Sequence, residues 1–462
     1  MSSGKYVLRV SDSVKPQQSL ALKAASKVWF SISLRTFGGP AGQIALMHDE
    51  LVEKRRWIGE ERFLHALSFC TLLPGPEAQQ LAIYLGWLLN GTTGGLIAGT
   101  LFVIPGYVAL MILSAVYAQW GETVGVAAVF AGLGPAVLAI VAQALWRIRK
   151  RALTNSFLWA ISFLSFLALI MFNVPFPIVV AGAALAGFVA NKCRPQWFVK
   201  PPVEIVEQQR QPLIPDEALH GARATLSGSI TVLLVGLFLW ALPVVVAAFV
   251  LGRNHVFVEQ GVFFSGTAIV TFGGAYAVLS YVAQRAVSVF QWLLPGEMVN
   301  GLALAETTPG PLIMVVQFVG FLGAFRNPGD LNPWVAAIIG STLVVWVTFV
   351  PCFLFVFLGA PHIEGLRNNH SVSASLTAVT GAVVGVIANL SVYFALHTLF
   401  EKTHSYSLGV IQTNLPNLGT FSIRAGLLTL LAVTLVFKFK RSTLQVMGIC
   451  AAVGAAAYLL AQ

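Results

Sequence analysis

Long apolar runs separated by short polar or basic stretches dominate the pattern along the chain. Nine of these runs approach or exceed the roughly 20 residues that a helix needs to cross a bilayer. They are 96–117, 124–146, 157–172, 175–190, 230–251, 335–358, 372–400, 423–437 and 444–460. Charged residues make up 10% of the 462 residues, against about 25% in a soluble domain. The pattern predicts an all-α polytopic membrane protein.

Two Pro-Gly-Pro motifs interrupt this apolar pattern, at 74–76 and at 309–311. A helix cannot pass through them unbroken, because proline lacks an N–H and restricts the residue before it. At the first motif we predict a helix that restarts with Gly75 as its cap and Pro76 as its first residue. The N–H groups of residues 77–79 would then lack intrahelical partners, which makes each break a candidate anion site.

The two breaks belong to a larger internal similarity. Shifting the chain by 235 residues superposes residues 36–39 on 271–274, the two Pro-Gly-Pro motifs, and Trp57 on Trp292. Seven identities therefore fall in two compact motifs, Thr-Phe-Gly-Gly and Pro-Gly-Pro, which indicates a duplication. We expect two homologous copies of one unit.

Basic residues set the predicted orientation of the copies. The stretches 147–151 and 191–227 are basic and should be cytoplasmic. The span at 230–251 has no partner in the first copy, so it would deliver the second copy inverted, as in many secondary transporters. The predicted divisions are 1–22, a cytoplasmic N-terminal lead without a cleavable signal; 23–190, the first repeat; 191–228, a cytoplasmic linker; 229–255, a connecting transmembrane span; and 256–462, the second, inverted repeat.

The Phe-Gly-Gly and Pro-Gly-Pro segments leave two topologies open. Re-entrant hairpins would keep the basic residues 54–56 on the cytoplasmic side. Two full crossings would also bring the chain back to the cytoplasmic side, but they would place residues 54–56 outside. Residues 42–62 between these segments predict an amphipathic interfacial helix, or else a solvated connector.

Composition argues against several classes of chemistry. The four cysteines are scattered singly, the eight histidines form no cluster, and no phosphate-binding loop motif occurs. We therefore expect no metal, no cofactor, no catalytic residue and no ATP hydrolysis. Membrane lipid, rather than nucleic acid, should surround so apolar a chain. The sequence leaves a homo-oligomer open.

With these motifs in view, the chain resembles the chromate ion transporter family of bacterial inner-membrane proteins. The resemblance rests on F-G-G-P-A-G-Q-I-A at 37–45, R-R-W-I at 55–58, L-L-P-G-P-E-A-Q-Q at 72–80, F-G-G-A-Y at 272–276 and G-L-A-L-A-E-T-T-P-G-P at 301–311. It implies chromate efflux and resistance, sulfate as a competing anion, and a multi-pass inner-membrane protein with a cytoplasmic N-terminus. It also implies about thirteen apolar segments in oppositely oriented halves, which equal our nine runs plus four hairpin segments.

Three other functions stay open at this stage. They are uptake of sulfate or a related oxyanion, an oxyanion channel, and an intramembrane oxyanion reductase. The reductase is disfavoured, because the sequence offers no site for a redox cofactor.

The predicted site combines neutral backbone donors with a few polar side chains, since a tetrahedral oxyanion needs several donors in a small space. Predicted substrate-binding residues are Arg35, Gly38, Gly39, Gly75, Gln79, Gln80, Gly273, Gly274, Thr307, Thr308 and Gly310, and predicted gating or proton-coupling residues are Glu77 and Glu306.

Each assignment has a plainer alternative. The breaks could be hinges alone, Glu77 a capping carboxylate, and Gln79 and Gln80 links between helices. Arg35 could reach an interface or pair with Glu77.

Overall fold

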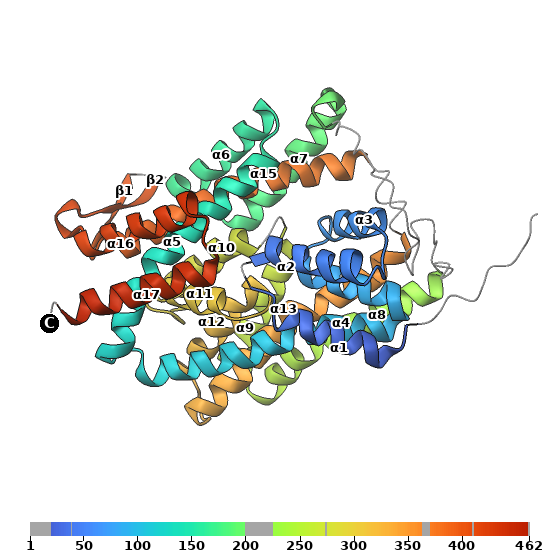
Figure 1. Cartoon of the computed structure of the whole chain (residues 1–462), viewed down its shortest axis with the longest axis horizontal. Helices are drawn as coiled ribbons and strands as arrows, with labels where there is room; N and C mark the ends of the chain where they lie inside the picture. Colours follow the sequence, from blue (N-terminus) through green and yellow to red (C-terminus); the bar gives the residue numbers. More distant parts are fainter. Residues whose placement is uncertain are drawn as a thin grey trace, which may run out of the picture.

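The computed structural model describes residues 20–37, 39–198, 225–272, 275–362, 370–408 and 411–460, and most of them are helical (Figure 1). Three predicted site residues, Gly38, Gly273 and Gly274, lie outside the described residues, as do most of the N-terminal lead and of the linker. The elements up to residue 198 are α1 (Leu22–Ser33), α2 (Gly39–His48), the π-helical turn η1 (Asp49–Lys54), α3 (Glu60–Cys70), α4 (Glu77–Trp120), α5 (Val124–Ala152), α6 (Ser156–Phe172), α7 (Phe176–Cys193) and η2 (Pro195–Phe198).

The elements after residue 224 follow a similar order. They are α8 (Leu226–Val250), α9 (Val256–Val270), α10 (Ala275–Ser288), α11 (Glu297–Thr307), η3 (Leu312–Met314), α12 (Val315–Arg326), α13 (Pro333–Gly359), η4 (Ala360–His362), α15 (His370–Leu399), β1 (Thr403–Leu408), β2 (Ile411–Pro416), η5 (Leu418–Thr420), α16 (Ile423–Val433), η6 (Thr434–Lys438) and α17 (Thr443–Leu459).

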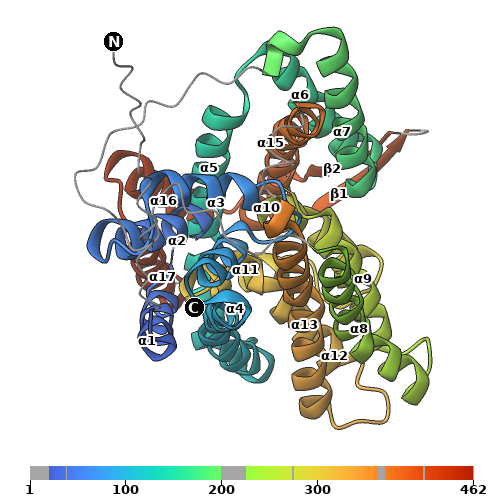
Figure 2. The same cartoon turned by 90° about the vertical axis from the view of Figure 1, so that its right-hand side faces the viewer.

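All nine predicted apolar runs lie in helices, which confirms an essentially all-α membrane protein. Six helices of the described chain are long and apolar enough to cross a bilayer: α4, α5, α7, α8, α13 and α15. α8 lies at the edge of the bundle (Figure 2), and Ala247 is its one buried residue. Its exposed apolar side chains suit contact with lipid.

Three local features differ from the predictions. First, α4 runs for 44 residues and joins the segment after the first break to the predicted span, with non-helical backbone at Asn90 and Gly91. Second, the interfacial helix predicted over 42–62 is wrong, because η1 ends at Lys54 and Arg56 adopts a φ of 52° before α3 begins. Third, the antiparallel hairpin of β1 and β2 was not predicted.

The same turn occurs at two positions 235 residues apart. Trp57 N–H donates to the carbonyl of Leu51, and Trp292 N–H donates to that of Ala286, each over 2.8 Å. The residue before each tryptophan has a positive φ, 52° in the first turn and 53° in the second. Backbone geometry thus follows the sequence similarity.

Candidate functional site

Each Pro-Gly-Pro motif interrupts the helical structure as predicted. At the first break α3 ends at Cys70 and α4 begins at Glu77, with Pro76 as its cap, one residue later than predicted. At the second break α11 ends at Thr307 and the chain resumes in η3. Gly75 and Gly310 have φ values of 122° and 108°, where an L side chain would be strained.

Each break forms a backbone hydrogen bond with the other half of the chain. Gly75 N–H donates to the carbonyl of Thr271 over 2.7 Å, and Gly310 N–H donates to that of Thr36 over 3.0 Å. Each threonine directly precedes the Phe-Gly-Gly motif of the other half. Each Pro-Gly-Pro motif therefore lies against the residue that precedes the Phe-Gly-Gly motif of the other half.

Buried glutamines of the first half surround the breaks. Gln43 Nε2 donates to the carbonyl of Gly310, and Gln80 Nε2 donates to that of Pro74 over 2.6 Å. The Oε1 atoms of both side chains, and both amide atoms of fully buried Gln79, have no hydrogen-bond partner in the described chain. Buried polar atoms without partners are costly, so they point to a ligand or water at this site.

An acid and a phenol mark the second break. Glu306 is 3% exposed, and the Tyr276 hydroxyl donates to its Oε1 over 2.6 Å. The hydroxyls of Thr307 and Thr308 donate to carbonyls of their own helix, at 2.8 and 3.0 Å. To donate a hydrogen bond to an anion, each hydroxyl must give up its carbonyl acceptor. Tyr276 was not among the predicted site residues, although it stands in the F-G-G-A-Y motif.

Glu77 occupies the first turn of α4, directly after the first break. Its side chain is partly buried, and its carboxylate has no hydrogen bond or ion pair within the described residues. Glu77 and Glu306 thus bring one acid to each break.

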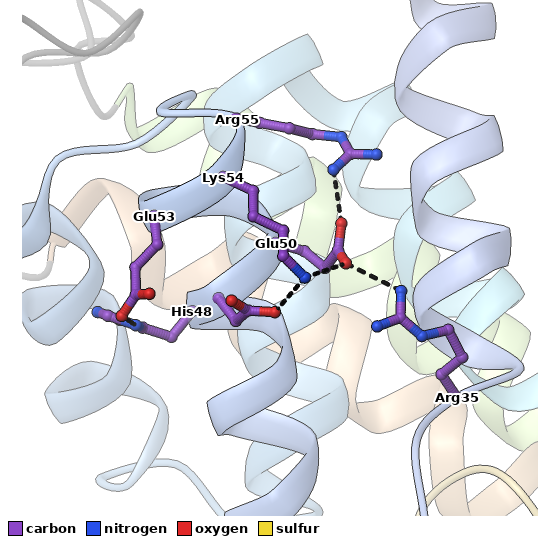
Figure 3. Close-up of polar contacts among 7 residues, drawn as sticks. Arg35, His48, Glu50, Glu53, Lys54 and Arg55 are labelled. Atoms are coloured by element: carbon purple, nitrogen blue, oxygen red, sulfur yellow. Dashed lines mark hydrogen bonds and ion pairs between the residues drawn. The ribbon is translucent and has the colours of Figure 1, made fainter.

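Arg35 does not pair with Glu77, so that alternative is wrong. Its Nη1 donates to Glu50 Oε1 over 2.9 Å (Figure 3). Lys54 and Arg55 contact the same carboxylate at 3.2 and 2.5 Å. Arg35 therefore pairs with Glu50, which is 15 residues away in sequence, and not with Glu77 at the first break.

The Glu50 carboxylate is 7% exposed and holds three cations. Burial raises its pKa, but the hydrogen bonds from Arg35 and Lys54 and the charge of Arg55 outweigh burial, so the pKa of Glu50 is lowered overall. The cluster ties the end of α1 to η1, and the half-exposed Arg35 keeps donors free for an anion.

A cavity of about 890 Å³ lies away from the predicted residues, where α4 meets α5 and α11 begins. Arg326 forms a two-point ion pair with Glu297 at its edge, with distances of 2.6 and 2.7 Å. Tyr117 OH also donates to Glu297. No motif in the sequence indicated this cavity. Within the described chain, no group of three or more His, Cys, Asp or Glu side chains could hold a metal ion.

Comparison with known proteins identifies the family. The sequence profile described as "Chromate transporter" matches residues 24–188 and 258–455. The chain belongs to the chromate transporter family. The chain is similar to proteins named for chromate transport, which indicates a transporter rather than an enzyme.

Three curated relatives of this chromate transporter family cover most of the chain. Identity is 28% to the "Chromate transport protein" of Cupriavidus metallidurans, over 92% of this chain and 90% of the relative. It is 30% to the "Chromate transport protein" of Pseudomonas aeruginosa, over 83% of each. It is 26% to the "Probable chromate transport protein" of Synechococcus elongatus, over 85% and 88%. No solved structure matches the chain.

Proposed function

We propose that this protein is a secondary transporter that exports chromate from the cytoplasm and so confers chromate resistance. Sulfate, a dianion of the same shape, competes for its site. The protein sits in a bacterial inner membrane with its N-terminus in the cytoplasm. The names of the relatives support chromate as the substrate. The observation that carries the proposal is the crossed pairing of Gly75 and Gly310 with Thr271 and Thr36.

Two inverted repeats underlie this proposal. One family profile matches twice, at 24–188 and 258–455, inside the proposed repeats 23–190 and 256–462. The long helix α4 contacts both halves of the chain. Asn90, near its kink, donates to the carbonyl of Leu20 before α1, whereas Tyr117, near its other end, donates to Glu297 at the start of α11. The first half therefore starts near one end of this span, and α11 starts near the other.

The breaks are the proposed substrate site. An oxyanion takes over the Gly75 and Gly310 N–H groups from the threonine carbonyls and receives a further hydrogen bond from the unpartnered Nε2 of Gln79. Gln80 Nε2 adds another donor once it releases the carbonyl of Pro74. A Cβ placed on Gly39 would meet no atom within 4 Å, so there is space beside that backbone. The other proposed contacts are Arg35, Gly38, Gly273, Gly274, Thr307 and Thr308, with Glu77 and Glu306 for gating or proton coupling.

Everted membrane vesicles test the function directly. Vesicles from cells that express the protein should take up radiolabelled chromate saturably, and excess sulfate should inhibit that uptake. Export from the cytoplasm appears as uptake in this geometry. Uptake that never saturates and shows no counterflow would indicate a channel. Chromate uptake by right-side-out vesicles alone would indicate an importer.

A further inference from the structure

The cavity of about 890 Å³ lies between the two halves of the chain. α4 and α5 of the first half line it, together with the start of α11 and the ends of α12 and α15 from the second half. It reaches the surface at Gln119, Glu122 and Pro295, which are exposed. One water molecule occupies roughly 30 Å³ in the liquid. The cavity can therefore hold a small anion together with part of its hydration shell.

Two helices connect this cavity to the second Pro-Gly-Pro break. Val299 and Asn300 of α11 line the cavity, and α11 ends at Thr307, directly before the break. Leu322 and Arg326 of α12 also line it, and α12 begins after the short turn η3 that follows the break. At a rise of 1.5 Å per residue, the 11 residues of α11 span about 16 Å. The cavity and the break thus lie at opposite ends of the same two helices.

The cavity lies on the membrane face opposite to the linker. α15 is long and apolar enough to cross a bilayer. Near its start, Ser371 accepts a hydrogen bond of 3.4 Å from Asn191 at the end of α7, directly before the linker that we propose to be cytoplasmic. At its other end, His397 and Thr398 line the cavity. In the proposed orientation the cavity therefore opens to the outside of the cell.

Arg326 brings an unused pair of donors to the cavity. Its Nη1 donates to the Trp292 carbonyl and to Glu297 Oε2, and its Nη2 donates to Glu297 Oε1. Of the five N–H groups of the guanidinium, the Nε–H and the second N–H of Nη2 have no acceptor within the described chain. These two groups point in parallel from one edge of the plane, so they can bind an oxyanion through two hydrogen bonds. The side chain is 32% exposed, so an ion can reach it.

Thr398 adds a neutral donor. Its Oγ1 is buried and has no hydrogen-bond partner in the part of the chain that the structure describes. A buried polar atom without a partner is costly and indicates a ligand or water beside it. A Cβ on Gly134 would lie 3.6 Å from the Thr398 methyl group and 3.7 Å from the Val299 side chain. Thr398 therefore lies where α5, α11 and α15 meet at the cavity.

We propose that the exported oxyanion binds in this cavity before it leaves the protein, with Arg326 and Thr398 as its ligands. The inference rests on the proposed function and adds a second, outer site to the one at the breaks. The charge of Glu297 is matched by Arg326, whereas the exposed Glu122 at the rim opposes a dianion. Binding at the outer site should therefore be weak, as release from the protein requires.

Exchange in right-side-out vesicles tests the outer site, because these vesicles present the cavity to the medium. Vesicles loaded with radiolabelled chromate should release it faster when unlabelled chromate is added outside. The external concentration that gives half-maximal release measures the affinity of the outer site. R326Q should raise this concentration about tenfold or more, and T398V about threefold or more. The KM for chromate in everted vesicles, which present the cytoplasmic face, should change by less than about threefold.

Two variants serve as matched controls. R424Q removes an exposed arginine at the start of α16, where Ser422 N–H donates to the Leu399 carbonyl at the cavity end of α15. T377V removes a hydroxyl of α15 that donates to the Ser373 carbonyl. Both variants should stay within about twofold of the wild-type concentration for half-maximal release. A rise in R424Q as large as that in R326Q would show a general effect of charge on this face and would contradict the site.

R326Q also removes the partner of Glu297, so two further variants separate binding from structure. E297Q keeps the guanidinium, and its concentration for half-maximal release should stay at or below the wild-type value. R326Q/E297Q restores the charge balance without the ligand and should remain as weak as R326Q. Recovery of the wild-type value in R326Q/E297Q, or equal rises in E297Q and R326Q, would show that the pair only joins α11 to α12.

The half-maximal concentration does not depend on the amount of protein in the membrane, so a variant that inserts poorly stays informative. A wild-type protein that neither exchanges nor takes up chromate contradicts the proposed function. Wild-type exchange with an unchanged half-maximal concentration in R326Q and T398V contradicts only the outer site.

Discussion

Tyr107 and Thr342 are 235 residues apart in the sequence, and their hydroxyl groups share a hydrogen bond of 2.7 Å. The same shift of 235 residues superposes the two Pro-Gly-Pro motifs. In two copies related by a two-fold rotation, equivalent residues touch each other only at the axis. The contact therefore supports a two-fold relation between the halves, with its axis between α4 and α13.

Inverted halves should be visible by labelling. In a background without the four native cysteines, K54C and V289C occupy equivalent positions, each three residues before the tryptophan of the repeated turn, and both native residues are exposed. A membrane-impermeant thiol reagent should label them from opposite faces of the membrane. Labelling of both from one face would contradict the inverted arrangement, whatever the transport activity.

Substitution of Gly106 in α4 should impair transport, because Gly106 lies against the second Pro-Gly-Pro break. A Cβ there would lie 2.4 Å from the carbonyl oxygen of Pro309, which is backbone and cannot rotate away. G106A should therefore displace the second break, at about 1–3 kcal/mol of stability, and strongly reduce chromate uptake. G182A is the matched control, because its Cβ would meet no atom within 4 Å. Equal uptake by the two variants would show that the break tolerates displacement.

Much of the architecture was predictable from residues with strong local effects. Proline and glycine dictate where the helices break, and apolar length dictates the spans, so both could be located before any contact was known. The 235-residue offset then paired the breaks. The hairpin of β1 and β2 could not be found this way, because its polar strands carry no spanning signal.

The hydrogen-bond and ion-pair partners of the site residues could not be predicted from the sequence, because they depend on how the helices are rotated against one another. Nothing local indicates that Gly75 would bond to Thr271, or that Arg35 would meet Glu50 rather than Glu77.

Glu50 should stabilise the protein through its charge. Its lowered pKa means that its stabilising effect is complete above the unfolded value of about 4.3 and is lost as pH falls through the lower folded value. At pH 7, E50Q should lose about 1–3 kcal/mol of stability in detergent, because three cations lose their acceptor. The difference from wild type should shrink below about pH 4.

Thermal unfolding at several pH values measures this effect, with E53Q as the control, because Glu53 is 62% exposed and contacts only His48 among the ion pairs found. A loss in E50Q that is the same at pH 7 and at low pH would contradict a role for the charge. So would equal losses in E50Q and E53Q.

Tyr276 and Glu306 should act as one unit. Y276F keeps the ring but removes the hydroxyl that donates to the carboxylate. Loss of a hydrogen bond to a charged group is worth about 1.5–3 kcal/mol, so chromate uptake should fall roughly tenfold or more. Y276F/E306Q should be no worse than E306Q, as expected for residues in direct contact. Y406F, which changes the exposed side chain of Tyr406 in β1, is the control. Losses that simply multiply in the double variant would show that the two residues act independently.

Membrane voltage should drive export. Moving one elementary charge through 100 mV is worth about 2.3 kcal/mol, so an exported dianion gains roughly 4.6 kcal/mol from an inside-negative membrane. At about 1.4 kcal/mol per tenfold gradient, that voltage holds cytoplasmic chromate down by about three orders of magnitude if no other ion is coupled. Expression should therefore lower chromate accumulation in energised cells, and collapse of the voltage with valinomycin and potassium should slow net export. Export that responds to the proton gradient alone would point instead to proton antiport, with Glu77 and Glu306 as the first acids to replace. Accumulation that rises on expression would reverse the direction to uptake.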